Sequence, residues 1–92
     1  MRLYLACFDI EDDKNRRKLG HLFLHYGQRV QYSVFEISLK DERQLDRLRA
    51  QCQRYIAPGD SLYFYWITQQ GAAKSKDVDG HPIAQYPAVI VL

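Results

Sequence analysis

A single aspartate interrupts an otherwise apolar segment near the beginning of the chain. Residues 3 to 10 read Leu-Tyr-Leu-Ala-Cys-Phe-Asp-Ile, which is typical of a central strand covered on both faces. Asp9 shares the strand face of Leu5 and Cys7 and lies at the carboxyl end of this segment. Burial of an unpaired carboxylate is strongly unfavourable, so we expect Asp9 to have a hydrogen-bonding, ionic or metal partner.

Two explanations of Asp9 are consistent with the sequence. In the first, its carboxylate accepts backbone N–H groups at the following turn or pairs with Arg16 or Arg17. In the second, its hard oxygen atoms bind Mg²⁺ or Mn²⁺, although one carboxylate makes a poor site by itself. A symmetric dimer would bring a second Asp9, and an ion between the two carboxylates would offset their repulsion. Such an ion can polarise a phosphate or activate water for in-line attack.

A basic segment follows Asp9 along the chain. Residues 14 to 18 read Lys-Asn-Arg-Arg-Lys and carry four positive charges, and Arg29 opens the next predicted strand. These side chains could grip a phosphate backbone. A solvated helix face is the alternative interpretation, although positive charges are unfavourable at the amino-terminal end of a helix. The segment is the strongest candidate for a nucleic-acid contact in this sequence.

Other polar groups have simpler explanations. His21 and His25 have the i, i+4 spacing of metal ligands, but the glutamate of a zinc protease motif is missing. The acidic residues 11 to 13 lack the glycine and the closing glutamate of a calcium loop, and helix capping explains them better. Cys7 and Cys52 lie in separate apolar segments without a CxxC motif, which favours buried, reduced thiols.

Hydrophobic spacing predicts the elements that position these residues. From residue 12 to 26, apolar side chains recur at helical spacing after an aspartate cap, and Gly27 is available for the left-handed position after the helix. Residues 29 to 39 alternate as a strand that is long enough to bend into two. Within that strand, Ser33 could donate to a phosphate, and Phe35 on the same face could stack or pack.

A second helix and strand are predicted in the other half of the chain. Asp41 and Gln44 form a variant of the capping box before a helix that Pro58-Gly59 terminates. Residues 61 to 67 are an aromatic strand with apolar side chains on both faces. Residues 68 to 87 are polar and contain glycine and proline, so we expect a mobile connection before a terminal strand at residues 88 to 92.

The order of these elements predicts an α+β fold. A chain of 92 residues has room for one domain, and the elements follow the β-α-β-β-α-β order of a ferredoxin-like sandwich. The additional carboxyl-terminal strand could reach its own sheet or exchange between protomers. We therefore predict a single ferredoxin-like domain over residues 1–92, with the terminal strand exchanged in a homodimer.

Composition is compatible with a dimer but does not identify a ligand. Aromatic residues make up 13% of the chain, which is more than a small core needs and favours an interface. The net charge of +2 is too small to establish nucleic-acid binding by itself. The sequence shows no apolar run of membrane-spanning length and no signal-peptide features, so we expect a cytoplasmic protein without membrane contact.

Several motifs, in a fixed order, make the sequence similar to a known family. Residues 4 to 10 read Tyr-Leu-Ala-Cys-Phe-Asp-Ile, residues 15 to 19 Asn-Arg-Arg-Lys-Leu, and residues 26 to 36 Tyr-Gly-Gln-Arg-Val-Gln-Tyr-Ser-Val-Phe-Glu. With Asp-Ser-Leu at 60 to 62 before an aromatic strand, they resemble the CRISPR-associated Cas2 family over residues 3 to 67. The resemblance implies a ferredoxin-like fold and a symmetric dimer. Residues 68 to 87 carry no recognisable family motif.

The resemblance also implies functional residues. Family members are described as Mg²⁺-dependent endonucleases whose metal-associated, catalytic aspartate ends the first strand, which corresponds to Asp9 here. The basic residues of the first helix, the arginine that opens the second strand and the Ser-Val-Phe turn are implied to contact substrate. In this chain these residues are Arg16, Arg17, Arg29, Ser33 and Phe35.

The implied function is the acquisition of new spacers for antiviral defence. The protein would act there as a metal-dependent endonuclease on phosphodiester bonds of RNA or DNA, with Mg²⁺, or alternatively Mn²⁺, as cofactor. The alternative is a non-catalytic, homodimeric DNA-binding scaffold for the CRISPR integrase Cas1, since each chain has one candidate carboxylate and no second local acid or base. A small-molecule regulatory module is a third use of such a fold. The sequence distinguishes neither RNA from DNA nor single from double strands.

Overall fold

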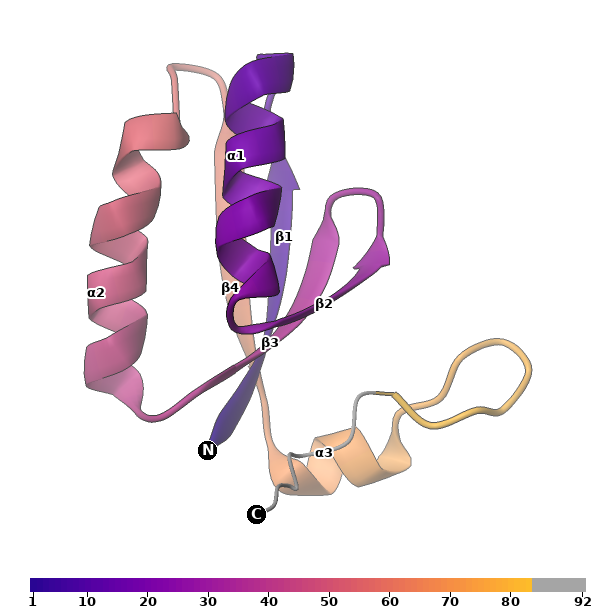
Figure 1. Cartoon of the computed structure of the whole chain (residues 1–92). Helices are drawn as coiled ribbons and strands as arrows, with labels where there is room; N and C mark the ends of the chain where they lie inside the picture. The colour runs from indigo at the N-terminus through magenta and orange to yellow at the C-terminus, as the bar shows by residue number, and fades with distance from the viewer. Residues whose placement is uncertain (84–92) are drawn as a thin grey trace.

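The computed structural model describes residues 1–83, which form a four-stranded antiparallel sheet with two long helices on one face (Figure 1). The strands are β1 (Arg2–Asp9), β2 (Gly27–Gln31), β3 (Val34–Leu39) and β4 (Ser61–Ile67), in the sheet order β2-β3-β1-β4. Helix α1 (Asp13–Leu24) connects β1 to β2, and α2 (Glu42–Cys52) connects β3 to β4. The predicted α+β, ferredoxin-like fold is confirmed.

The core lies between the sheet and the two helices. In the antiparallel register of β1 and β3, Tyr4 is opposite Ile37 and Ala6 is opposite Phe35, and all four side chains are buried. Phe23 of α1 packs on this face, with its ring centre 5.6 Å from that of Phe35. Burial of each large apolar side chain contributes about 1.5–3 kcal/mol. This cluster fastens the β2–β3 hairpin to α1.

The opposite face of the sheet is largely open in the described chain. Leu3 is buried, but Leu5 and Cys7 are only half-buried, and Tyr63 and Tyr65 of β4 are 56% and 52% exposed. The prediction that β1 is covered on both faces is therefore wrong for much of its length within residues 1–83. The reason is that α1 and α2 pack on the same side of the sheet (Figure 1).

An aspartate cap starts α1, as predicted. The Asp12 carboxylate accepts hydrogen bonds from the backbone N–H groups of Lys14 at 2.8 Å and Asn15 at 3.1 Å. These bonds satisfy donors that have no partner inside the helix. They stabilise the ionised carboxylate, and the bond from Asn15 is the main cause that holds the pKa of Asp12 below its ordinary value.

The carboxyl end of α1 differs from the prediction. The helix ends at Leu24, His25 caps it with ordinary right-handed backbone angles, and Gly27 begins β2 without a positive φ. The glycine is needed for another reason, because a Cβ on Gly27 would lie 1.9 Å from the carbonyl oxygen of Glu36 on β3. Gly27 therefore permits a close approach of two backbones.

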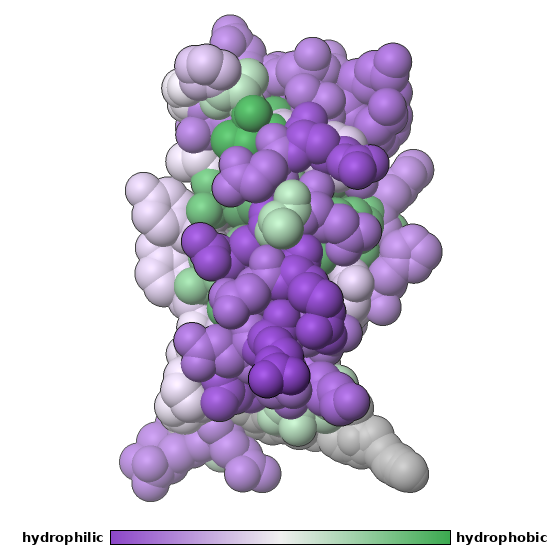
Figure 2. Space-filling model, turned by 90° about the vertical axis from the view of Figure 1, so that its left-hand side faces the viewer, coloured by the Kyte–Doolittle hydropathy of each residue, from purple (hydrophilic) through white to green (hydrophobic). Residues whose placement is uncertain are grey.

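Reciprocal side-chain contacts start α2. Asp41 accepts the backbone N–H of Gln44 at 2.9 Å, and the Gln44 side chain accepts the backbone N–H of Lys40 at 2.5 Å. The predicted capping-box variant is confirmed, with Gln44 reaching one residue further back than in the usual box. The helix continues as a 3₁₀ turn at Gln53–Tyr55. Its outer surface is mainly hydrophilic (Figure 2).

The remaining connections are partly as predicted. Residues 29 to 39 contribute to two strands, β2 and β3, as expected. After β4, however, a short helix, α3 (Gln69–Lys74), begins at Thr68, whose hydroxyl accepts the N–H of Gly71 at 3.0 Å. Sequence patterns do not identify this helix within the connection of residues 68 to 87, since a helix this short is marginal on its own and shows little hydrophobic periodicity.

The carboxyl-terminal residues 84–92 lie outside the described part of the structure. The predicted strand at residues 88 to 92 and its exchange between protomers therefore stay predictions. Among residues 1–83, none of the helices combines the length and the apolar character needed to cross a membrane.

Candidate nucleic-acid interface

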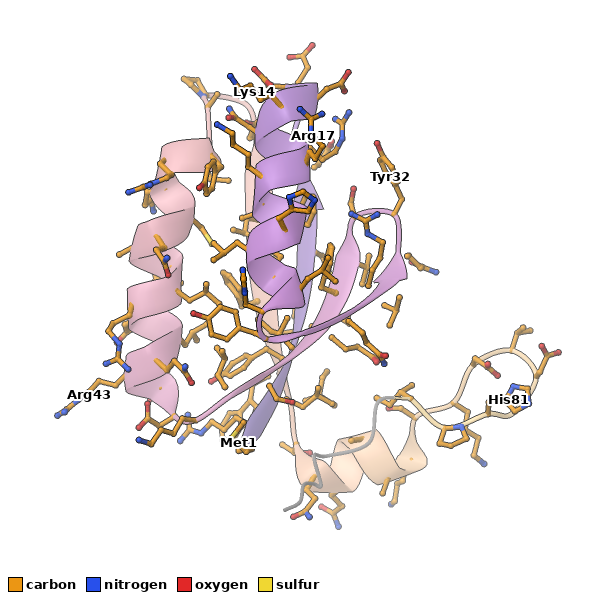
Figure 3. All side chains as sticks on the ribbon, viewed as in Figure 1. Met1, Lys14, Arg17, Tyr32, Arg43 and His81 are labelled. Atoms are coloured by element: carbon orange, nitrogen blue, oxygen red, sulfur yellow. The ribbon has the colours of Figure 1, made fainter. Side chains whose placement is uncertain are left out.

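Three segments meet at the end of the sheet where β1 finishes. They are the loop from β1 into α1, the first turns of α1, and the turn between β2 and β3. Lys14, Arg17 and Tyr32 lie at this end, whereas Arg43 lies at the other (Figure 3). The antiparallel pairing of β1 with β3 causes this meeting, because it places the start of β3 beside the end of β1.

Arg16 ties these three segments together. Its guanidinium donates to the carbonyl oxygen of Ile10 at 2.5 Å and to the Tyr32 hydroxyl at 3.2 Å, and it forms an ion pair with the Asp13 carboxylate. The guanidinium carbon also lies 5.6 Å from the centre of the Tyr32 ring, within the range of a cation–π contact. Arg16 therefore fixes the shape of the site.

Arg29 reaches the same region from β2. Its guanidinium carbon lies 5.0 Å from the centre of the Phe35 ring, which also suits a cation–π contact. Gly20 on α1 leaves space for this group, since a Cβ there would lie 3.0 Å from Nη2 of Arg29. The Phe35 ring and the space that Gly20 leaves on α1 therefore position the guanidinium of Arg29.

The arginines line a small cavity beside α1. Its volume is about 340 Å³, and its lining residues are Asp13, Arg16, Arg17, Arg29 and Tyr32. Asp13 is neutralised by Arg16, whereas the guanidinium groups of Arg17 and Arg29 make no hydrogen bond or ion pair within residues 1–83. The structure thus brings together the three arginines predicted from the sequence, and two of them have donors free for a phosphate.

Asp9 lies at the same end of the sheet but is not part of this cavity. Its side chain is exposed, and it makes no hydrogen bond or ion pair with any of residues 1–83. The Asp9 carboxylate neither accepts backbone N–H groups of the following turn nor pairs with Arg16 or Arg17. In this turn it is Asp60 that accepts the backbone N–H of Glu11, at 3.2 Å. The expected burial of the Asp9 charge is also absent from the single chain.

A metal ion at Asp9 would need further ligands. The exposed, unpaired carboxylate offers hard oxygen atoms that suit Mg²⁺. Asp60 is not free to help, because its two oxygen atoms accept the backbone N–H groups of Glu11 and Ala57. Asp9 therefore fits as one ligand of an ion whose other ligands come from phosphate, water or a second chain. In residues 1–83, the one group of three side chains close enough to bind a metal lies after α3 and consists of Asp77, Asp79 and His81.

The other two predicted contacts lie in different environments. Ser33 is in the β2–β3 turn, half-buried, and its carbonyl oxygen accepts the backbone N–H of Phe8 at 3.0 Å. Phe35 is fully buried, so its ring supports Arg29 and is closed to a stacking base. This corrects the expectation that Phe35 touches substrate. The physical reason is its pairing with β1 on the face that the helices cover.

Sequence reasoning misses Tyr32. Strand alternation groups it with Val30 and Val34, whereas the structure places it in a turn with its ring beside Arg16. The sequence feature that could have indicated Tyr32 is its position as an aromatic residue next to Ser33, in a segment that also contains Arg29.

The fold and this site define a small ferredoxin-like domain with a cavity lined by arginines. The chain belongs to the CRISPR-associated Cas2 family: the family model described as CRISPR associated protein Cas2 matches residues 1–75. It is 47% identical over 70 residues to the CRISPR-associated endonuclease Cas2 2 of Thermus thermophilus, covering 75% of this chain and 77% of that relative. It is 43% identical over 92 residues to the CRISPR-associated endoribonuclease Cas2 3 of Synechocystis sp., covering all of both chains.

Solved structures agree with this assignment. A chain of a partial Cas6-RT-Cas1–Cas2 complex superposes with a TM-score of 0.84 at 41% identity, over the full length of both chains. Cas2 of Streptococcus pyogenes superposes with a TM-score of 0.70 at 27% identity, over 83% of this chain and 98% of the other. The family resemblance found in the sequence is therefore confirmed.

Proposed function

We propose that this protein takes part in CRISPR spacer acquisition as a homodimeric, Mg²⁺-dependent endonuclease that cleaves phosphodiester bonds of RNA or DNA. The observation that carries the proposal is the cavity lined by Arg16, Arg17 and Arg29 at the end of the sheet where Asp9 is exposed. Relatives whose names include endonuclease or endoribonuclease support the activity.

The residues of the site suit hydrolysis of a phosphodiester. In that reaction a water oxygen forms a bond to phosphorus, the bond to the leaving oxygen breaks, and a proton passes from the water to the leaving oxygen. Arg17 and Arg29 would hold the phosphate backbone next to the cleaved bond. Asp9 would help to hold Mg²⁺, which when bound supplies positive charge that polarises a phosphate oxygen.

The open sheet face supports the homodimer. Tyr63 and Tyr65 are exposed there with their rings stacked at 6.0 Å, next to the half-buried Leu5 and Cys7. An exposed aromatic and aliphatic face of this kind favours association. Asp9 ends β1, so a two-fold axis that crosses this face near that end would bring the Asp9 side chains of both protomers toward each other. It would thereby supply the second carboxylate that one chain lacks.

A second candidate function is a non-catalytic scaffold that holds DNA for the integrase Cas1. The separation of Asp9 from the arginine cavity favours this alternative, because nucleic acid can bind the arginines without approaching the carboxylate. The structural similarity to a chain of a complex that contains Cas1 supports Cas1 as the partner in either case.

One experiment separates the two functions. Labelled single-stranded RNA and double-stranded DNA are incubated with the purified dimer in Mg²⁺ or in EDTA. The variants are Asp9→Asn, Arg16→Ala combined with Arg17→Ala, and Glu11→Gln, which removes the charge of an exposed acid two residues from Asp9. The endonuclease proposal expects cleavage by the wild type and by Glu11→Gln in Mg²⁺, and none by Asp9→Asn or in EDTA.

Cleavage that survives Asp9→Asn would remove Asp9 from catalysis. If the wild-type dimer binds DNA without cleaving either substrate, the scaffold becomes the better account. In that case Asp9→Asn should leave spacer integration with Cas1 intact, whereas the double arginine variant should impair it.

A further inference from the structure

Tyr32 is distinctive because its ring is both exposed and anchored. The residue is 69% exposed in the β2–β3 turn and lines the arginine cavity. Its hydroxyl nevertheless accepts a hydrogen bond from Nε of Arg16, whose guanidinium is itself held by the carbonyl oxygen of Ile10. Arg16 thereby limits the rotation of the ring, which projects from the turn at the end of the sheet where Arg17 lies (Figure 3).

The cavity beside this ring suits a nucleotide phosphate. Its volume of about 340 Å³ leaves room for a phosphate and part of its sugar. The guanidinium groups of Arg17 and Arg29 have free donors, and the one carboxylate of the lining, Asp13, is paired with Arg16. The polar part of a nucleotide would enter the cavity, while its base would remain near the exposed ring.

We propose that Tyr32 stacks on the unpaired base of a nucleotide whose phosphate is bound by Arg17 and Arg29. The inference rests on the proposed function, because it names the kind of nucleic acid that the site binds. A base inside a duplex already has neighbours on both faces, whereas a single strand or a frayed end offers a free face to an aromatic ring. The site therefore prefers unpaired nucleotides to blunt duplex, with little dependence on base identity.

Binding in the absence of cleavage tests this preference. Fluorescence anisotropy in EDTA compares a short labelled single strand with a blunt duplex, for the wild type, Tyr32→Leu, Tyr32→Phe and Arg17→Ala. We expect Tyr32→Leu to weaken single-strand binding about tenfold, which corresponds to ~1.4 kcal/mol and lies within the range for one base–aromatic stack. Duplex binding should change by less than about twofold. Tyr32→Phe keeps the ring but loses the hydrogen bond from Arg16, so it should weaken single-strand binding less than Tyr32→Leu does. Arg17→Ala should weaken the binding of both ligands.

A spectroscopic readout reports the stack directly. A 2-aminopurine base placed in the single strand loses fluorescence when it stacks, so the wild type and Tyr32→Phe should quench it and Tyr32→Leu should not. Equal losses for single strand and duplex, or equal losses for Tyr32→Phe and Tyr32→Leu, would overturn the stacking role. If the wild type binds neither ligand, the proposed function itself fails. If it binds both and Tyr32→Leu changes nothing, this inference fails alone.

Discussion

Replacement of Gly27 by alanine should destabilise the edge of the sheet that carries Arg29. The new Cβ would lie 1.9 Å from the carbonyl oxygen of Glu36 and 2.7 Å from Cα of Ile37, whereas ordinary contact begins at 3.4 Å. The two strands would have to separate locally by about 1.5 Å, the difference between 3.4 and 1.9 Å. Backbone hydrogen bonds of ~2.9 Å do not survive such a change.

The expected magnitude follows from the bonds that are lost. Each net backbone hydrogen bond contributes about 0.5–1.5 kcal/mol, so loss of two or three costs roughly 1–4 kcal/mol. For a domain of this size, at about 4–8 °C per kcal/mol, that lowers the melting temperature by roughly 4–30 °C. The result is informative because alanine in place of glycine normally stabilises a strand whose backbone angles any residue can adopt.

Gly20→Ala is the matched control. Its Cβ would lie 3.0 Å from Nη2 of Arg29, which is the end of a flexible side chain, and 3.5 Å from the Phe35 ring. Alanine inside a helix is better than glycine by about 0.8–1.0 kcal/mol, so the melting temperature should stay constant or rise by a few degrees. Thermal unfolding followed by circular dichroism measures both variants, at one protein concentration because the proposed dimerisation would shift the apparent stability. A melting temperature for Gly27→Ala at or above that of Gly20→Ala would refute the reasoning.

Two further predictions concern titratable groups. Backbone N–H groups lower the folded-state pKa of Asp12, so its stabilising effect is present above the unfolded-state value of about 3.9 and is lost as the pH falls through the lower folded value. Asp12→Ala should therefore melt below the wild type at neutral pH, with a gap that closes in acid, while Asp12→Asn, which keeps a cap that does not titrate, should vary less with pH in this range. Burial raises the pKa of the Cys52 thiol to about 12, so at about pH 8 only roughly one thiol in ten thousand is ionised. A thiol reagent followed by mass spectrometry should leave Cys52 unmodified until denaturant is added, and rapid labelling of the native protein at this residue would contradict that expectation.

The order of the elements and much of the core can be read from the sequence. Alternation along residues 29 to 39 and helical spacing after Asp12 predict two strands and a helix, because periods of 2.0 and 3.6 residues reflect local backbone geometry. The caps at Asp12 and Asp41 are also local, since each carboxylate bonds an N–H group two or three residues further on. The three arginines of the cavity can also be identified from local sequence. Arg16 and Arg17 belong to the basic segment, and Arg29 opens the next predicted strand.

Only the tertiary structure decides which of these residues face one another. Both faces of β1 are apolar in sequence, so periodicity alone does not reveal that the helices cover one face and leave Asp9 exposed on the other. Phe35 and Tyr32 are three residues apart, yet strand pairing buries the first beneath Arg29, and the turn exposes the second beside Arg16. These outcomes depend on contacts between segments distant in the chain, and one sequence contains no direct record of such contacts. The sequence by itself therefore supplies the residue types of the site. The packing of α1 against the β2–β3 hairpin determines the geometry of the site.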